Sequence, residues 1–228
     1  MLTPALAQTD TTKTAANDNV YGGFLTLPIE FPVINHAAID QQLGSAGLPA
    51  LNYSAANFGL GVQLYLDQFI TTFSFNKTTN RKDQGSYLTE VEYRSTSFNF
   101  GYDLVKDFRY SAYPYIGFKG CGVSYLYREK LPDDTALRDY LNTPLQYKEI
   151  TNSRAHLDLG IGLSHQWFYL VNFRAGYLLP LEAARWNMSG NKTPLAASPG
   201  ISYPYYFSLT LGLGNITSTK QLERHFNR

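Results

Sequence analysis

His156 and Asp158 are the pair of side chains in this sequence best suited to proton transfer, since only one position separates them. On a β-strand, residues two apart lie on the same face, so the carboxylate could orient the imidazole as a general base. An enzyme of this kind also needs a nucleophile, yet the sequence contains neither Gly-x-Ser-x-Gly nor His-Glu-x-x-His. Arg154, on the same face, would disfavour the imidazolium that a general base must form. We therefore predict a structural histidine and keep an enzyme as the alternative.

Other charged side chains would form a polar network if the strands turn them toward one common interior. Buried charges persist only when they are paired and hydrogen-bonded, so opposite signs are expected together. Arg174 should lie within ion-pairing reach of a carboxylate, with Asp158 or Glu92 as its partner. The predicted interior network, which we assign a structural role, comprises Glu90, Glu92, Arg94, Lys119, His156, Asp158 and Arg174.

No cofactor or metal site is expected from the remaining reactive residues. His36, His165 and His225 are far apart in the sequence, and Cys121 is the only cysteine, so no metal-ligand spacing exists. The formal net charge is +1, which gives no electrostatic reason to expect a nucleic-acid partner.

The elements that must position these residues are strands, because apolar and polar residues alternate with period 2 from Val20 onward. Short and long connections also alternate, which is typical of an antiparallel up-and-down meander. The short connections are 67–68, 103–108 and 166–167, whereas the long ones are 32–57, 78–86, 129–146 and 183–202. The eight predicted strands are 21–31, 58–66, 69–77, 87–102, 109–128, 147–165, 168–182 and 203–215.

Charge content distinguishes a membrane barrel from a soluble one, in which the polar face must be well hydrated. Only 16% of the residues are charged, against about 25% in ordinary globular domains. The strand windows 58–66, 69–76, 155–164, 168–181 and 203–214 contain two charged residues, Asp158 and Arg174. A Lys or Arg that faces lipid at the bilayer midplane costs about 2–4 kcal/mol, which explains this depletion. The sequence therefore predicts apolar side chains outside and polar side chains inside.

Three local features of the sequence lead to further structural predictions. In the strand 87–102, the apolar residues change from odd to even positions near Ser95 and Thr96, which predicts a β-bulge. Residues 35–44 are expected to form a short helix within the first long connection. Tyrosines near the strand ends, among them Tyr113 and Tyr206, are expected to form interfacial girdles.

This pattern divides the chain into three segments. Residues 1–19 contain Ala5-Leu6-Ala7, which resembles the cleavage site of an export signal, followed by a polar leader that is expected to be disordered. Residues 20–215 are predicted to be the transmembrane β-barrel. Residues 216–228 are predicted to be a polar periplasmic tail.

The strand count, the meander and the loop asymmetry resemble the small eight-stranded outer-membrane barrels of the OmpX, OmpW and OmpA-transmembrane-domain type. The resemblance implies short periplasmic turns, long extracellular loops and a place in the outer membrane of a Gram-negative bacterium. The polar tail departs from that pattern, because such chains commonly end in an aromatic residue at the end of the last strand.

For function, we predict a non-catalytic barrel with a structural or binding role. Its partners would be outer-membrane lipid and other envelope proteins, which it would contact through loops 32–57, 129–146 and 183–202. The alternatives are passage of small apolar molecules, as the OmpW resemblance implies, and a lipid-modifying enzyme.

Overall fold

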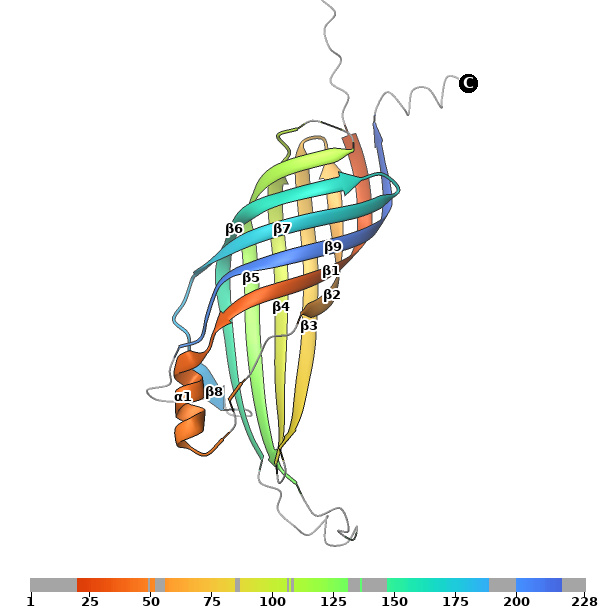
Figure 1. Cartoon of the computed structure of the whole chain (residues 1–228). Coiled ribbons are helices and arrows are strands. Elements are labelled where there is room, and N and C mark those ends of the chain that lie inside the picture. The colour runs from red at the N-terminus through yellow and green to blue at the C-terminus, as the bar shows by residue number, and fades with distance from the viewer. Residues whose placement is uncertain are drawn as a thin grey trace, which may run out of the picture.

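Eight long strands close into a barrel in the computed structural model of the chain (Figure 1). The structure describes residues 20–218, except 49, 52–55, 85–86, 106, 108, 131–135, 137–146 and 189–199. Each barrel strand pairs antiparallel with its neighbours, and β1 closes the ring by pairing with both β2 and β9. The eight strands are β1 (Val20–Asn35), β2 (Asn57–Leu66), β3 (Phe69–Gln84), β4 (Tyr87–Tyr102), β5 (Tyr110–Glu129), β6 (Tyr147–Gln166), β7 (Tyr169–Pro180) and β9 (Ser202–Ser218). The predicted eight-stranded up-and-down barrel is thereby confirmed.

Both the start of β1 and the end of β9 lie at the end of the barrel that carries the short turns. The amide of Asp67, in the turn between β2 and β3, donates to the carbonyl oxygen of Val20. Helix α1 (Ala37–Ser45) and the short strand β8 (Trp186–Met188) lie at the opposite end (Figure 1). Within the described residues, no helix has both the length and the apolar character needed to cross a bilayer.

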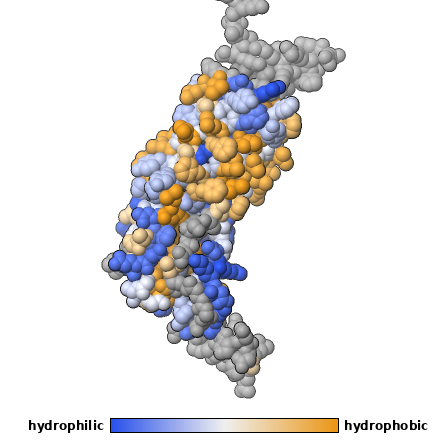
Figure 2. Space-filling model, viewed as in Figure 1, coloured by the Kyte–Doolittle hydropathy of each residue, from blue (hydrophilic) through white to orange (hydrophobic). Residues whose placement is uncertain are grey.

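Apolar side chains gather on the half of the barrel that contains the start of β1 and the end of β9, on the face that Figure 2 shows, and we call the outward apolar side chains of this half the belt. Its side chains occupy every second position on all eight strands and point outward, whereas the intervening positions are buried. No charged residue interrupts these outward positions, so this surface suits hydrocarbon rather than water. The belt includes Leu25, Leu27, Phe31, Phe58, Leu60, Val62, Leu64, Leu66, Phe69, Phe73, Phe75, Phe98, Phe100, Ile116, Phe118, Ile161, Leu163, Phe173, Tyr177, Leu179, Tyr205, Phe207, Leu211 and Leu213.

Strands β3 to β6 continue past the belt, and there the two faces of β4 and β5 exchange their polarity. We call the ends 77–84, 87–94, 120–129 and 147–155 the projection. Along β4, Phe98 and Phe100 point outward within the belt, but Glu90, Glu92 and Arg94 occupy the outward positions of the projection. The inward positions change in the opposite sense, from Ser, Asn and Gly to apolar and aromatic residues. The projection is therefore built like a water-soluble sheet with an apolar interior.

This exchange corrects two sequence-based predictions. The change of phase near Ser95 and Thr96 is not a β-bulge, because β4 keeps an unbroken register with both β3 and β5. The outward side chains change there instead, from apolar to polar and charged. The segment 78–86 is not a long loop, since β3 extends to Gln84 and β4 begins at Tyr87.

An apolar cluster closes the barrel at the projection end. The predicted helix is present as α1, and it buries Ile39 and Leu43 against the inner wall. Trp186 of β8 is fully buried in the same cluster. The rest of the cluster consists of Leu51, Val91, Tyr93, Cys121, Val123, Tyr125, Tyr127, Leu178, Ile201, Tyr203 and Tyr206.

Tyrosines and glycines interlock across the interior of the membrane-facing half. Tyr113 lies directly opposite Gly162 in the register between β5 and β6, and Tyr206 lies opposite Gly176 between β9 and β7. A Cβ atom at Gly162 would come within 2.3 Å of the Tyr113 ring, so only glycine leaves room for that ring. Tyr113 and Tyr206 thus pack inside and do not form an interfacial girdle, although Tyr205 does face outward.

The structure tests part of the predicted division of the chain into three segments. The predicted leader, residues 1–19, lies outside the described residues. The barrel begins at Val20, but β9 continues to Ser218, so the first three residues of the predicted tail belong to the last strand. The remainder of that tail and most of the loop 129–146 lie outside the described residues.

Candidate functional site: the polar interior of the barrel

The structure places four residues of the predicted network inside the barrel, namely Lys119, His156, Asp158 and Arg174. The other three were predicted wrongly: Glu90, Glu92 and Arg94 lie on the outer face of the projection. Their positions share the outward phase of Phe98 on an unbroken strand, and water there hydrates their charges. Glu92 pairs with Lys77 at 2.9 Å and Glu90 pairs with Arg81 at 2.7 Å, both across β3 and β4.

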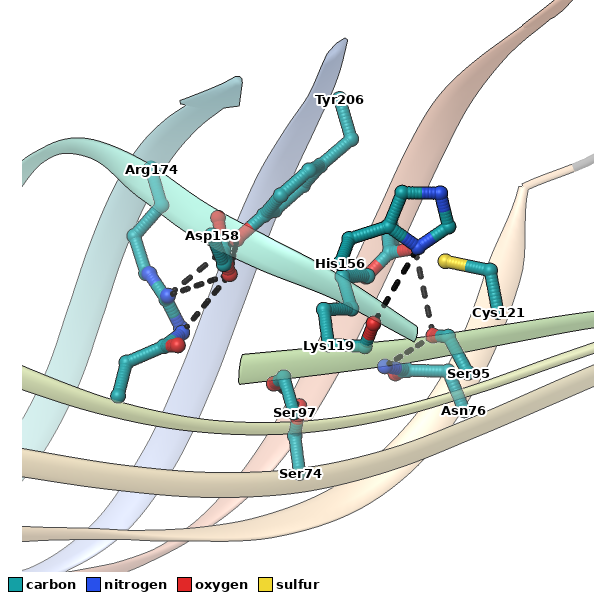
Figure 3. A network of polar contacts seen from close by, with 12 residues as sticks. Ser74, Asn76, Ser95, Ser97, Lys119, Cys121, His156, Asp158, Arg174 and Tyr206 are labelled. Carbon is teal, nitrogen blue, oxygen red and sulfur yellow. Dashed lines mark hydrogen bonds and ion pairs between the residues drawn. The ribbon is translucent and has the colours of Figure 1, made fainter. Parts of the chain in front are cut away.

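Asp158 and Arg174 form the first interior cluster (Figure 3), and Arg174 follows the belt residue Phe173 on β7. The Asp158 Oδ2 atom is 3.9 Å from Arg174 Nη2, so this is a loose ion pair. That oxygen also accepts a hydrogen bond from Tyr206 Oη at 2.7 Å and one from Asn99 Nδ2 at 3.1 Å. The Asp158 carboxylate therefore keeps two close donors besides the guanidinium.

Arg174 is held by neutral groups as much as by its carboxylate. Its Nη1 donates to Thr72 Oγ1 at 3.2 Å, and its Nη2 donates to Tyr206 Oη at 3.3 Å. The guanidinium carbon lies 4.2 Å from the centre of the Tyr115 ring, which is a cation–π contact. These contacts compensate for much of the water that the buried cation has lost.

Glu30 and Lys119 form the second interior cluster, which lies on the projection side of the first. The Lys119 ammonium donates to Glu30 Oε2, and both side chains are at most 3% exposed. Lys119 Nζ also lies 3.5 Å from the centre of the Tyr206 ring. Ser95 Oγ donates to Glu30 Oε1 at 3.3 Å, and Asn76 Nδ2 donates to Ser95 at 3.3 Å. Tyr206 therefore links the two clusters, with its ring against one cation and its hydroxyl between Asp158 and Arg174.

A third group of neutral side chains fills the interior toward the short turns. Asn172 receives a hydrogen bond from Tyr113 Oη at 3.0 Å and donates to Gln63 Oε1 at 2.8 Å. Gln166 accepts a hydrogen bond from Ser164 Oγ at 2.8 Å and donates from Nε2 to Ser111 at 2.8 Å. The two bonds of Asn172 link β7 to the non-adjacent strands β5 and β2 across the interior, whereas the bonds of Gln166 stay within β6 and its neighbour β5.

His156 is buried beside the second cluster, with only 1% of the residue exposed. Its Nδ1 lies 3.3 Å from the backbone oxygen of Lys119, and its ring meets the Tyr203 ring edge to face at 5.7 Å. Within the described part of the chain, no serine, threonine or cysteine side chain is hydrogen-bonded to either ring nitrogen. The imidazole thus packs against an aromatic ring and has no activated hydroxyl beside it.

Little free space remains among these side chains. The cavity that Glu30, Lys119 and Arg174 line has a volume of about 20 Å³, room for about one water molecule. Across the described ranges, no three His, Cys, Asp or Glu residues come together as metal ligands would. The cavity beside the two ion pairs therefore has no room for a molecule much larger than water.

Sequence reasoning missed several members of the network, among them Glu30, Asn99 and Tyr206. The signal for Glu30 was available, because it alternates with Ile29 and Phe31 and so shares the inward phase of Thr26. Asn99 likewise alternates with the belt residues Phe98 and Phe100. The inward direction of Tyr206 required the register of β9 against β7, because Tyr205 beside it is equally aromatic and faces outward.

No model of a protein family matches this sequence, and no curated protein matches it. Among solved structures, the chain is similar to Ail, the attachment invasion locus protein of Yersinia pestis, solved in complex with the heparin analogue sucrose octasulfate. The two share 8% sequence identity over 86% of this chain and 99% of Ail, with a TM-score of 0.47. It is also similar to a major outer membrane protein from Thermus thermophilus. Here the identity is 11% over 87% of this chain and 99% of the other, with a TM-score of 0.46.

Proposed function

We propose that this chain is a non-catalytic barrel of the outer membrane of a Gram-negative bacterium, and that it acts as an interaction module through its projection. The observation that carries this proposal is the exchange of polarity along β4 and β5. Apolar residues face outward in the belt, and charged, paired residues face outward beyond it. A barrel that only anchored itself in lipid would have no need to extend four strands into water around an apolar core.

The projection also presents a strand edge to which a partner could bind. Strand β2 ends its pairing where Phe58 lies opposite Lys77, whereas β3 continues to Gln84 with β4 as its partner. Among the described residues, the backbone of 78–84 therefore has a neighbouring strand on one side only. An extended segment of another protein can add to such an edge through main-chain hydrogen bonds. The corresponding edge of β6 is covered, because β8 pairs with Ile150–Asn152.

Passage of small apolar molecules is a second candidate with an observation in its favour. A groove of about 340 Å³ lies on the outer wall and is lined mainly by Phe31, Ile161, Phe173 and Phe207. Arg174 and Ser208 contribute to this groove and also to the interior cavity, so the wall between the two is thin. We favour the interaction role because the interior cavity holds only about one water molecule.

A photocrosslinking experiment in the producing cells separates the two candidates. A photoreactive amino acid at Thr79, which faces outward on the uncovered edge of β3, should give a discrete adduct with another envelope protein. The same amino acid at Thr71, which faces outward within the belt on the same strand, is the matched control and should give no protein adduct. If neither position gives an adduct, and the purified barrel instead speeds the entry of a small apolar dye into liposomes, the interaction role is wrong.

A further inference from the structure

Two cations face each other on the outer surface, immediately above the belt. Lys77 of β3 and Arg94 of β4 are direct partners in the antiparallel register, and both point outward. The next outward pair toward the membrane is Phe75 and Thr96, and the pair after that is Phe73 and Phe98. Like charges directly opposite each other destabilise a strand pair. The fold alone gives no reason to place two cations here.

Arg94 is the cation of this pair that lacks a carboxylate. Lys77 is 2.9 Å from Glu92, and the next cation along β3, Arg81, is 2.7 Å from Glu90. Within the described ranges, no carboxylate lies within 4.0 Å of the Arg94 guanidinium. The side chain lies across Gly122 of β5, where an added Cβ atom would be 3.1 Å from Arg94 Nε. Among the described residues, the Arg94 side chain is thus exposed and has no carboxylate partner, so its guanidinium is available to an outside anion.

The surface beside Arg94 is formed by residues with small side chains. Thr96 lies opposite Gly120 of β5, which in turn lies opposite Ala155 of β6. A Cβ atom at Gly120 would meet nothing closer than 4.0 Å, so the packing of this chain does not require glycine there. Glycine weakens a strand interior, and it often marks a place where a ligand approaches the backbone closely. The small residues leave a shallow platform between the Arg94 cation and the belt.

We propose that Lys77, Arg94 and the platform at Gly120 form a site for the phosphorylated headgroup of an outer-leaflet lipid. A guanidinium binds a phosphate through two parallel hydrogen bonds, and the ammonium of Lys77 adds a second charge. The source is a lipid and not a soluble phosphate, because Phe75 and Phe98 lie directly below. Acyl chains packed on those rings place their own headgroup at the level of Arg94. Glu92 competes for Lys77, so Arg94 supplies most of the attraction.

This inference rests on the proposed outer-membrane orientation, and its test is independent of any protein partner. The purified full chain in neutral micelles is titrated with diphosphorylated lipid A, and the bound lipid is counted by native mass spectrometry. We expect Arg94→Gln and Gly120→Val each to weaken lipid A binding about tenfold, the equivalent of one charge-assisted hydrogen bond. Arg94→Lys should fall between them and the unchanged protein. Arg81→Gln, which removes a cation four residues further from the belt than Lys77, is the matched control and should bind as the unchanged protein does.

Three outcomes would each contradict the proposed lipid site. Equal binding of a dephosphorylated lipid A would show contact with the acyl chains alone. Displacement of the lipid by inorganic phosphate at a similar concentration would show a site for soluble anions. Equal loss in the Arg81→Gln variant would show a diffuse charge effect. Each variant is first checked for the shift in gel mobility on heating that marks a folded barrel, so a loss of binding is read only on folded protein.

Discussion

Replacing Lys119 with alanine is expected to destabilise the barrel by about 3–5 kcal/mol, because the variant leaves the Glu30 carboxylate buried without a cation. Glu30 and Lys119 are at most 3% exposed, so water cannot replace the lost ammonium without opening the wall. The remaining donor to Glu30 is Ser95 Oγ at 3.3 Å, which is a weak substitute. The free energy of unfolding, measured by urea titration in lipid vesicles, gives the value.

Two comparisons identify the cause of this loss. The double variant Glu30→Gln with Lys119→Met removes both charges together, and it should recover most of the stability, since an unpaired buried charge is what costs most. Arg174→Ala should cost less than Lys119→Ala, because Asp158 keeps the hydroxyl of Tyr206 and the amide of Asn99 as donors. If the double variant were as unstable as Lys119→Ala, lost packing of the lysine chain would be the cause instead.

Gly162→Val is expected to be the second severe variant, with a loss of about 3 kcal/mol or failure to form a closed barrel. An added Cβ atom would lie 2.3 Å from Cζ of Tyr113 and 2.6 Å from its hydroxyl oxygen. That ring cannot swing aside without breaking its hydrogen bond to Asn172. The shift of the folded band on heating, followed with urea titration, reports both outcomes.

The matched control is Gly120→Val, which adds the same atoms to a strand glycine on the outer face. Its Cβ atom would meet nothing closer than 4.0 Å, so the stability should change by no more than about 0.5 kcal/mol. Adding Tyr113→Leu to Gly162→Val should restore part of the loss by making room. Equal losses in Gly162→Val and Gly120→Val would mean that β-propensity, and not the fit against Tyr113, governs these positions.

The sequence predicts the barrel well because each of its signals is local. Alternation along a strand shows which residues share a face, and the turn at Asp67 and Gln68 separates two such runs by two residues, as the structure confirms. Scarcity of charge then identifies which face meets lipid in the belt. The same reasoning places Lys119, His156, Asp158 and Arg174 on the inward face.

The errors arise where the surroundings change along one strand. Val91 and Phe98 are both apolar, yet Val91 packs inside the projection and Phe98 faces outward in the belt. If the whole strand is assumed to lie in one environment, all its apolar residues must share one face, and a β-bulge has to be predicted. That bulge places Glu90, Glu92 and Arg94 on the inward face, which is wrong. The partners of Tyr206 were beyond prediction for another reason: they come from β5, β6 and β7, whose registers the sequence does not give.

The central claim is that one continuous face of β4 passes from lipid to water, and spin labels along that face test it directly. Single cysteines replace Glu90, Glu92, Phe98 and Phe100 in a Cys121→Ala background, and the labelled protein is reconstituted into vesicles. Collisions with oxygen, which concentrates in hydrocarbon, are compared with collisions with a water-soluble nickel chelate. We expect labels at 98 and 100 to collide mainly with oxygen, and labels at 90 and 92 to collide mainly with the chelate. Labels at 90 and 92 shielded from the chelate, or labels at 98 and 100 open to it, would contradict the account.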